Sequence, residues 1–274
     1  MKIKSLFSIL FIISIFFVQN LIAQQQKEDF KPLYVTITKL HNTSTDIDLE
    51  EWKGIEQEFF DKITNKIDLI VGHEILINYN KKNETEVILI NMYKSWDDIE
   101  KTKELRKQLI EKAWPNKEAR YAFFEKQNKD FKYYYSNEIF ISTSLAKYMN
   151  KEDKNKQKEP LLYYIIKNKL SDYEYDDSLD AYRNYIDNVT YKNPYIKAYL
   201  TYKHYVGSDS RDFFETYVVG SLTDLQKSLD KDRELFKKYI PNEIERKEFL
   251  EVYYEGIDDV SDVGIYMNIP SMSK

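Results

Sequence analysis

The sequence predicts an α+β protein made of two copies of one small βαββαβ unit. The first observation is a segment that occurs twice: Trp114–Glu125 (WPNKEARYAFFE) returns as Ile240–Glu251 (IPNEIERKEFLE), 126 residues later and without a gap. Five of the twelve positions are identical, namely Pro115/Pro241, Asn116/Asn242, Arg120/Arg246, Phe123/Phe249 and Glu125/Glu251. One register shared by two distant segments indicates an internal duplication.

The second observation is that the same spacing aligns positions of several structural types. Helix caps, turn residues and apolar core positions all match: Phe59/Tyr185, Tyr79/Tyr205, Glu86/Asp212, Ser95/Ser221, Asp98/Asp224, Leu109/Leu235 and Phe140/Tyr266. Because caps, turns and cores have different sequence signatures, one register through all of them favours a repeated fold over a repeated motif.

The first copy begins with a strand, a helix and a hairpin. Leu33–Leu40 alternates like a strand, and a helix with apolar residues at helical spacing follows from Leu49 to Ile63. Thr45, Asp46 and Asp48 precede that helix, and each can supply the side-chain oxygen of an N-cap. Ile70–Tyr79 and Glu86–Tyr93 are predicted strands joined by the polar turn 80–85.

Two helices and a strand complete the first copy. Ser95 is the predicted cap of a helix that runs to about Ala113, and Pro115 is predicted at the first position of a short helix. The range Phe131–Ser142 contains the fourth strand. The recurrence of Arg120 and Arg246 favours a structural role for both, such as fixing the short helix.

The second copy follows a charged segment and has the same order. The run 151–158 (KEDKNKQK) has no apolar face and is predicted to be a solvated linker, so that repeats at 33–146 and 161–270 flank a linker at 147–160. The predicted elements are the strand Leu161–Lys167, the helix Ser178–Asn188, the hairpin Tyr195–Tyr205 with Phe213–Val219, a helix from Ser221 to Tyr239, a short helix from Pro241 and the strand Val263–Asn268.

Composition excludes several functional classes. The 274 residues carry a formal net charge of −5, which argues against a nucleic-acid partner. The absence of cysteine removes thiol nucleophiles, disulfides and cysteine-ligated metal centres. The 24 tyrosines have two interpretations: they pack at half-exposed positions, which we favour, or they form aromatic surfaces for flat ligands.

The N-terminal segment 1–23 has the pattern of a secretory signal peptide. Lys2 and Lys4 begin it, and Leu6–Val18 is an apolar run with serines. An uncleaved anchor is the alternative, but polar residues interrupt the run before the roughly 20 residues that a span prefers. We expect an exported protein, periplasmic or secreted, with a flexible tail at 24–32 and no membrane segment after cleavage.

The repeated element order, the Ser-x-x-Asp helix starts at Ser95 and Ser221, and the late strands NEIFIS and DVGIYMN resemble the dimeric α/β-barrel superfamily in its fused tandem form. The resemblance covers most of residues 33–268 and implies two ferredoxin-like repeats whose antiparallel sheets pack as an intramolecular α/β barrel. It also implies a monomer with an internal pseudo-dimer. The superfamily includes antibiotic-biosynthesis-type monooxygenases, haem-degrading enzymes and small-molecule isomerases.

The three histidines are the first candidates for chemistry. His41 is predicted in a surface loop, His73 in the second strand of the first copy and His204 near the end of the equivalent strand in the second. Their strand parities differ, so we expect His73 and His204 on opposite sheet faces and no shared metal site. The resemblance brings haem as a hypothesis, since haem needs one histidine, but the relatives' Asn–Trp–His set has no residue-by-residue counterpart here. We otherwise expect no cofactor.

The stretch 202–212 (YKHYVGSDSRD) gathers the remaining candidates. The functional interpretation gives His204 and Tyr202 catalytic roles and assigns ligand binding to a further set: Arg211, Asp209, Asp212 and, outside the stretch, His73. The structural interpretation is an ordinary hairpin turn in which Arg211 pairs with a nearby carboxylate.

These observations leave three functional hypotheses. The first is an exported small-ligand-binding protein of uncharacterised role. The second is a monooxygenase-like enzyme, cofactor-independent or haem-associated, with His204 and Tyr202 in its pocket. The third is a structural or interaction protein. A pocket lined by the candidate residues would favour the first two, because a filled interior leaves no room for a ligand.

Overall fold

The computed structural model describes residues 30–42, 47–79, 86–134, 138–172, 176–207 and 209–274, so the signal-peptide prediction and the turn at 80–85 lie outside the described residues. Residues 33–274 form one compact unit. Its strands are β1 (Tyr34–Asn42), β2 (Ile70–Asn78), β3 (Glu86–Tyr93), β4 (Phe131–Tyr134), β5 (Ile139–Ser142), β6 (Leu162–Leu170), β7 (Ala198–Val206), β8 (Asp212–Val219) and β9 (Ile257–Asn268).

The helices follow the strands in two similar series. They are α2 (Leu49–Lys62), α3 (Trp96–Ala113), α4 (Lys117–Gln127), α5 (Lys151–Lys156), α6 (Asp176–Asn188), α7 (Leu222–Tyr239) and α8 (Glu243–Glu255), with short 3₁₀ turns at Thr64–Lys66, Thr190–Lys192 and Pro270–Met272. Setting aside α5 and β4, the elements from β1 to β5 and those from β6 to β9 therefore have the same order.

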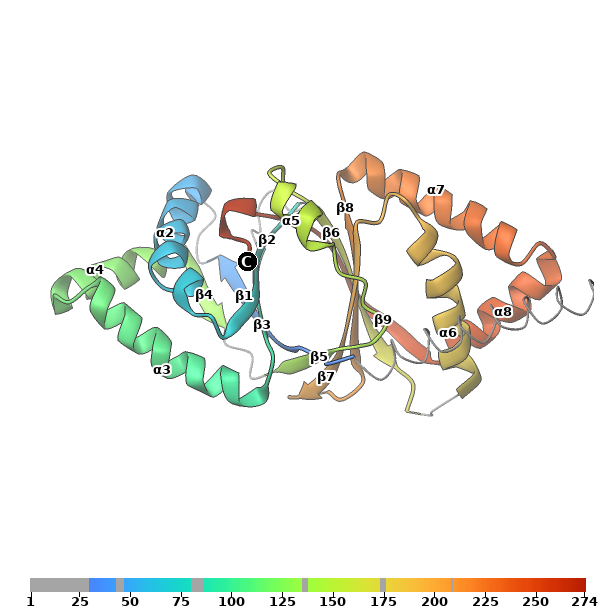
Figure 1. Cartoon of the computed structure of the whole chain (residues 1–274), viewed down its shortest axis with the longest axis horizontal. Coiled ribbons are helices and arrows are strands. Elements are labelled where there is room, and N and C mark those ends of the chain that lie inside the picture. Colours follow the sequence, from blue (N-terminus) through green and yellow to red (C-terminus); the bar gives the residue numbers. More distant parts are fainter. Residues whose placement is uncertain (1–29, 43–46, 80–85, 135–137, 173–175, 208) are drawn as a thin grey trace, which may run out of the picture. The chain divides into compact units, whose positions relative to one another are not determined.

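All nine strands belong to one antiparallel sheet (Figure 1). The order β5-β1-β3-β2 in the first series matches β9-β6-β8-β7 in the second. The two series join where β2 pairs with β9 and where β5 pairs with β7. Every strand except β4 consequently has a partner on both sides, since β1 is shared by β3 and β5. Each of these eight strands is therefore paired, over at least part of its length, along both of its edges.

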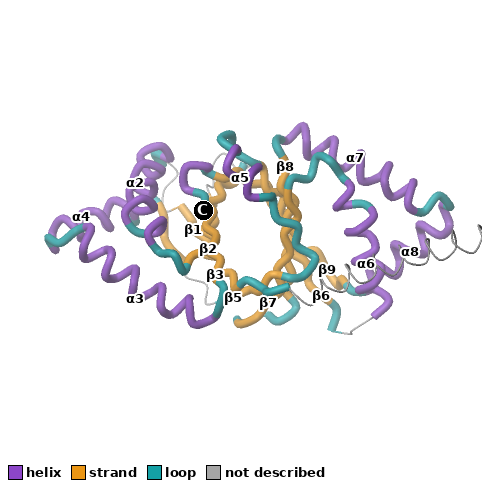
Figure 2. The backbone as a smooth tube through the Cα atoms, in the orientation of Figure 1, coloured by secondary structure: helices purple, strands orange, loops and turns teal. Residues whose placement is uncertain are grey.

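The two faces of the sheet bury different material. One face gathers mainly strand residues, including Val35, Leu76, Phe140, Tyr202 and Tyr266, and no helix of the described residues covers it. The other face is covered by α2–α4 over the first series and by α6–α8 over the second (Figure 2). Strand residues alternate between the faces, so each strand supplies both cores.

Most helix starts agree with the sequence. The exceptions are α6, which begins at Asp176, two residues before the predicted Ser178, and the two short helices that follow the repeated prolines. Asp48 caps α2, Ser95 caps α3 and Ser221 caps α7, each through its side-chain oxygen. Pro115 and Pro241, however, precede the caps instead of occupying the first helical turn. Asn116 and Asn242 are the caps, because an asparagine side-chain oxygen accepts a hydrogen bond from a free backbone N–H in the first turn of the helix. Proline has no side-chain acceptor.

Other differences are local. The first strand extends to Asn42, so His41 lies in β1 and not in a loop. The charged run 151–158 contains the helix α5, which Asn150 caps with a bond to the backbone of Asp153. The final strand begins at Ile257, six residues earlier than the sequence suggested, because β6 pairs with it along its length.

Candidate functional site

A cavity of about 190 Å³ lies between the helices α2–α4 and the strands β1–β3. Its apolar wall includes Phe59, Phe60 and Phe124. Its polar lining includes Glu56, His73, Asn91, Arg106, Gln127 and Asn128, and Thr38 and Thr64 complete it. Asn128 is exposed, which marks the side on which the cavity meets solvent. A cavity of roughly 150 Å³ is enough to bind benzene, so this one accommodates a small ring system.

His73 is the one sequence candidate that lines this cavity. It is 6% exposed, its ring stacks on Phe60 at 5.5 Å, and its Nδ1 donates to Oδ1 of Asn91 over 2.8 Å. The amide oxygen accepts only, so Nε2 is left as the acceptor nitrogen of the ring. Burial, with a smaller contribution from the nearby charge of Arg106, lowers the pKa of His73 to about 4, so the ring is neutral at pH 7.

A buried carboxylate and an arginine share the cavity with His73. Glu56 is 4% exposed and accepts a hydrogen bond from Nε2 of Gln127 over 2.9 Å. The Nε of Arg106 is buried, and among the described residues it has no hydrogen-bond partner. A buried donor of this kind costs about 1–3 kcal/mol unless something binds to it, which indicates a place for an acceptor atom of a ligand.

The segment after β9 holds β2 in position beside the cavity. Lys274 donates its N–H to the His73 carbonyl over 2.9 Å, and the N–H of His73 donates to the Lys274 carbonyl over 3.2 Å. Met272 is 1% exposed and packs with Trp52 and Phe60. The backbone of His73 and the ring that stacks on it are therefore both fixed by residues that follow β9.

His204 and Tyr202, the predicted catalytic pair, lie on the opposite face of the sheet. Tyr202 belongs to the core on the face of the sheet that no described helix covers. The His204 ring meets Phe140 of that core, with ring centroids 5.8 Å apart. Among the described residues, neither the Tyr202 hydroxyl nor Nε2 of His204 has a hydrogen-bond partner. The cavity that Tyr202 lines measures about 40 Å³, which holds water and not an organic substrate.

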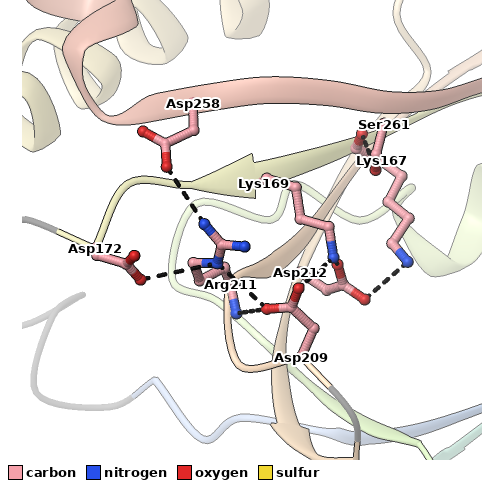
Figure 3. A network of polar contacts seen from close by, with 8 residues as sticks. All are labelled: Lys167, Lys169, Asp172, Asp209, Arg211, Asp212, Asp258 and Ser261. Atoms are coloured by element: carbon pink, nitrogen blue, oxygen red, sulfur yellow. Dashed lines mark hydrogen bonds and ion pairs between the residues drawn. The ribbon is translucent and has the colours of Figure 1, made fainter.

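Asp212 is the buried acidic residue of the predicted ligand-binding stretch, and it contacts two lysines of β6 (Figure 3). Asp212 is 1% exposed, and its carboxylate contacts Nζ of Lys167 at 2.7 Å and also Nζ of Lys169. Lys169 further contacts Asp209 at 2.7 Å and thereby lowers the pKa of that carboxyl group. These contacts tie β6 to the turn before β8.

Arg211 is surrounded by carboxylates of the protein itself (Figure 3). Its guanidinium lies 3.4–3.8 Å from the side chains of Asp172, Asp209 and Asp258. A ligand anion would have to displace at least one of these partners. The arrangement supports the structural interpretation of the hairpin turn.

The repeated arginines have the same role in both series. Nη1 of Arg120 donates to the Trp114 carbonyl over 3.2 Å, and Nη1 of Arg246 donates to the carbonyls of Ile240 and Pro241 over 2.8 and 2.7 Å. These carbonyls lie at the C-terminal ends of α3 and α7, where backbone acceptors lack helical partners. The arginines thus join two consecutive helices, which agrees with the structural role that their recurrence favours, although the contact is with the preceding helix and not with the sheet.

The second series carries tyrosines where the first has its cavity. The positions 126 residues after Glu56, His73, Asn91 and Gln127 are Tyr182, Tyr199, Tyr217 and Tyr253. The correspondence also holds in the strand ladders, since His73 pairs with Asn91 and Tyr199 pairs with Tyr217. Tyr182 and Tyr253 lie on α6 and α8, and Tyr199 and Tyr217 lie on the strands beneath them. All four pack together beside Glu215.

Sequence reasoning found His73 and missed the residues around it. Glu56, Asn91, Arg106 and Gln127 have no motif spacing, because they lie on four different elements. The available signal was the register itself: at these positions one half has polar or charged side chains and the other has tyrosine or, opposite Arg106, Asp232.

The residues present do not fit a haem in this cavity. Phe60 covers the His73 ring, and a cavity of about 190 Å³ is far too small for a four-pyrrole macrocycle. In the part of the chain that the structure describes, no three His, Cys, Asp or Glu side chains are grouped to hold a metal ion. We therefore derive no chemical step through haem.

No protein-family model and no curated protein matches the sequence. Solved structures do match. A candidate monooxygenase from Fusobacterium nucleatum subsp. nucleatum shares 8% identity at a TM-score of 0.53, and an anthrone oxidase-like protein shares 9% at 0.50; each match covers 88% of this chain and 92% of the other. A candidate chlorite dismutase shares 11% at 0.47, covering 88% and 96%.

The first two likenesses concern the fold. They show that this chain shares the fold of these two proteins, and no close family emerges. Within the described ranges, no helix has the length and apolar character needed to cross a membrane.

Proposed function

We propose that the cavity beneath α2–α4 is the active site of a monooxygenase-like enzyme that oxidises a small, flat, weakly acidic molecule with O₂. The observation that carries the proposal is the combination of a neutral imidazole acceptor and an unpartnered arginine Nε in one cavity with phenylalanine walls. The names of the two fold relatives, a candidate monooxygenase and an anthrone oxidase-like protein, support this class of reaction.

His73 is the proposed proton acceptor. Its bond to Asn91 fixes the tautomer and presents Nε2 with a free electron pair. Its pKa of about 4 keeps the ring from holding a proton taken from solvent at neutral pH. An anion formed beside it would raise that pKa, so proton transfer becomes more favourable as the substrate loses its proton.

Arg106 is the proposed stabiliser of the anion. A cation in a site with little water stabilises a developing oxyanion far more than it would in solution. The guanidinium also acts on His73 through its charge, which shows that the two side chains share one electrostatic environment. The bond between Gln127 and Glu56 joins α4 to α2 in the wall of the cavity.

Anthrone illustrates the proposed reaction. Its CH₂ carbon gives one proton to Nε2 of His73, and the enolate oxygen lies beside Arg106. The enolate carbon then forms a C–O bond with O₂ from solution, which gains the electron pair and becomes a carbon-bound peroxide. The second hydrogen of the former CH₂ group leaves as a proton, the electron pair of that C–H bond forms the new carbonyl of anthraquinone, and the O–O bond breaks. The departing oxygen takes this proton and the one held by His73 and leaves as water.

The proposed scaffold is a tandem duplication closed into an intramolecular barrel. Support comes from the matching strand orders, the 126-residue register and the partner on both sides of eight strands. In this proposal the two repeats provide each other with the second sheet, so the chain is a monomer with an internal pseudo-dimer.

Oxygen uptake with anthrone tests the enzyme proposal. We expect turnover in the native protein, and a loss of roughly 100-fold or more in kcat for His73→Phe and Arg106→Met, because each removes a group used in the transition state. Asp232→Asn is the matched control, since it changes the position 126 residues after Arg106 and leaves the cavity intact. Undiminished turnover in both cavity variants would refute the proposed roles.

A second candidate function is binding without turnover. The observation that favours it is the low pKa of His73, because a weak proton acceptor suits a hydrogen bond to a ligand hydroxyl better than proton abstraction. Calorimetric titration with anthrone under nitrogen separates the two. Binding without oxygen uptake in air supports the second candidate, and no binding removes both for this ligand class.

We also propose that the protein is exported after removal of residues 1–23. The charged start and the apolar run of that segment support it. N-terminal sequencing of protein recovered from the native host would give Gln24 as the first residue, whereas an intact Met1 would contradict cleavage.

A further inference from the structure

A row of tyrosines leads from a buried carboxylate to the surface of the second series. Glu215 on β8 is 4% exposed, and its Oε1 accepts hydrogen bonds from the hydroxyls of Tyr182 at 2.7 Å and Tyr199 at 2.6 Å. Its Oε2 accepts from Nδ2 of Asn168 at 2.6 Å. The hydroxyls of Tyr182 and Tyr199 are 2.5 Å apart. Two phenol protons therefore lie within reach of one carboxylate oxygen.

The rings are in contact from this centre outward. Tyr182 stacks on Tyr253 with centroids 5.3 Å apart, and Tyr253 meets Tyr254 edge to face at 5.0 Å. Tyr254 is 58% exposed, while Tyr182 and Tyr253 are buried. On the inner side, Tyr199 contacts Tyr217 at 5.0 Å. The row thus begins at solvent and ends at the carboxylate.

The carboxylate changes what the buried phenols can do. Removing an electron from an isolated buried phenol would leave a cation in a low-dielectric environment, which is very costly. When the phenol proton passes to Glu215 as the electron leaves, the tyrosine becomes a neutral radical and the carboxylate a neutral acid. The buried phenols beside Glu215 are therefore easier to oxidise than the exposed phenol at the other end.

We propose that this row is a redox site that accepts one oxidising equivalent at Tyr254 and holds it at Tyr182 or Tyr199. The oxidant is a one-electron oxidising radical from solution, which gains an electron and becomes its anion. The electron is drawn through Tyr253, and the Tyr182 or Tyr199 proton moves to Oε1 of Glu215. A one-electron donor from solution, such as an enediol or a thiol, later returns the electron, and the proton moves back from Glu215 to the phenol oxygen.

Tyr266 and Glu86 provide an internal comparison. The Tyr266 hydroxyl donates to Glu86 over 2.6 Å, which is the same length as the Tyr199 bond, but this pair is only partly buried. If a single tyrosine–carboxylate bond were enough, Glu86 would matter as much as Glu215. The proposal predicts that it does not, because the row of rings ends at Glu215.

Flash oxidation of the intact protein with a photoexcited ruthenium polypyridyl complex tests the proposal. The readouts are the yield and lifetime of the tyrosyl radical, by optical absorption and electron paramagnetic resonance. We expect Glu215→Gln, which keeps the side-chain shape, to shorten the lifetime by roughly tenfold or more, since the proton acceptor is lost. Glu86→Gln is the matched control and should leave the lifetime unchanged.

Tyr253→Phe gives an independent variant that keeps the ring packing. It should reduce the yield of the long-lived radical and leave the midpoint of urea unfolding unchanged, because only a hydroxyl is removed. If Glu215→Gln fails to fold, the Tyr253→Phe yield decides. A native lifetime in Glu215→Gln together with a native yield in Tyr253→Phe, or equal effects of the Glu86 and Glu215 changes, would overturn the proposal.

Discussion

The space beneath α2–α4 and the space beneath α6–α8 lie over corresponding parts of the sheet, and they are used in opposite ways. The first is a cavity of about 190 Å³ with a neutral histidine and an arginine in its lining. The second is packed with the rings of Tyr182, Tyr199 and Tyr253 around Glu215. The same architecture therefore holds a ligand-sized opening in one half and a closed polar core in the other.

The difference indicates that the first half is packed less well than the second at these positions. A buried tyrosine contributes apolar area and, when its hydroxyl is bonded, a satisfied polar group. His73 and Asn91 replace the tyrosine pair with smaller side chains and leave empty volume, which is a cost in stability. Departures from good packing of this kind are typical of functional sites.

Filling the cavity of the first half with tyrosines, as in the second half, is expected to have the largest effect of the changes described here. The double variant His73→Tyr/Asn91→Tyr copies Tyr199 and Tyr217 at the equivalent ladder positions. We expect the affinity for anthrone to fall by roughly 100-fold or more, about 2.7 kcal/mol, because two phenol rings would take the ligand's volume. Calorimetric titration measures it.

The matched control exchanges the two side chains, as His73→Asn/Asn91→His. This variant keeps the combined volume and the donor–acceptor pair, so we expect its affinity to stay within roughly tenfold of the native value. If the tyrosine variant binds as tightly as the exchanged one, the cavity is not where the ligand lies.

The pH dependence of stability sharpens the comparison further. His73 has its pKa lowered to about 4, below its unfolded value of 6.5, so the unfolded state binds more protons as the pH falls through this window. Its contribution to stability is complete above pH 6.5 and is lost progressively toward pH 4. Between pH 7 and pH 5 we expect a loss of about 2 kcal/mol from this group.

The measurement is urea unfolding of the native protein and of His73→Gln at both pH values. The second half supplies an opposing effect, since burial raises the pKa of Asp232 to about 6, and that carboxyl stabilises the protein as the pH falls. The difference between native and variant removes this shared background. Parallel losses in the two proteins would show that His73 titrates normally.

Most of the fold was predictable because its signals are local. The α3 and α7 boundaries follow from Ser95 and Ser221 as caps and from helical periodicity, and both structural helices begin at the next residue. The short helices were placed too early because the sequence shows proline before asparagine, and only the backbone geometry shows which of them is the cap.

The candidate site was less predictable because it is assembled by strand pairing and helix packing. His73 was found as a histidine, but Arg106 became its neighbour only through the packing of α3 on the sheet. Conversely, Arg211 and Asp212 looked like a site because they are adjacent in sequence, and the structure surrounds Arg211 with the protein's own carboxylates. Proximity along the chain carried less information than the mismatch between His73 and Tyr199.

The smallest expected effect concerns the feature that the two halves share most closely. Arg246 donates to two carbonyls at 2.8 and 2.7 Å, whereas Arg120 donates to one at 3.2 Å. We expect Arg246→Met to lower the free energy of unfolding by about 1 kcal/mol and Arg120→Met by less, because a single longer bond is weaker. Methionine retains most of the apolar stem, so the loss reports on the hydrogen bonds. Urea unfolding of both variants at pH 7 measures the difference. A larger loss at Arg120 would mean that the α3–α4 junction, which borders the cavity, depends on its arginine for more than carbonyl capping.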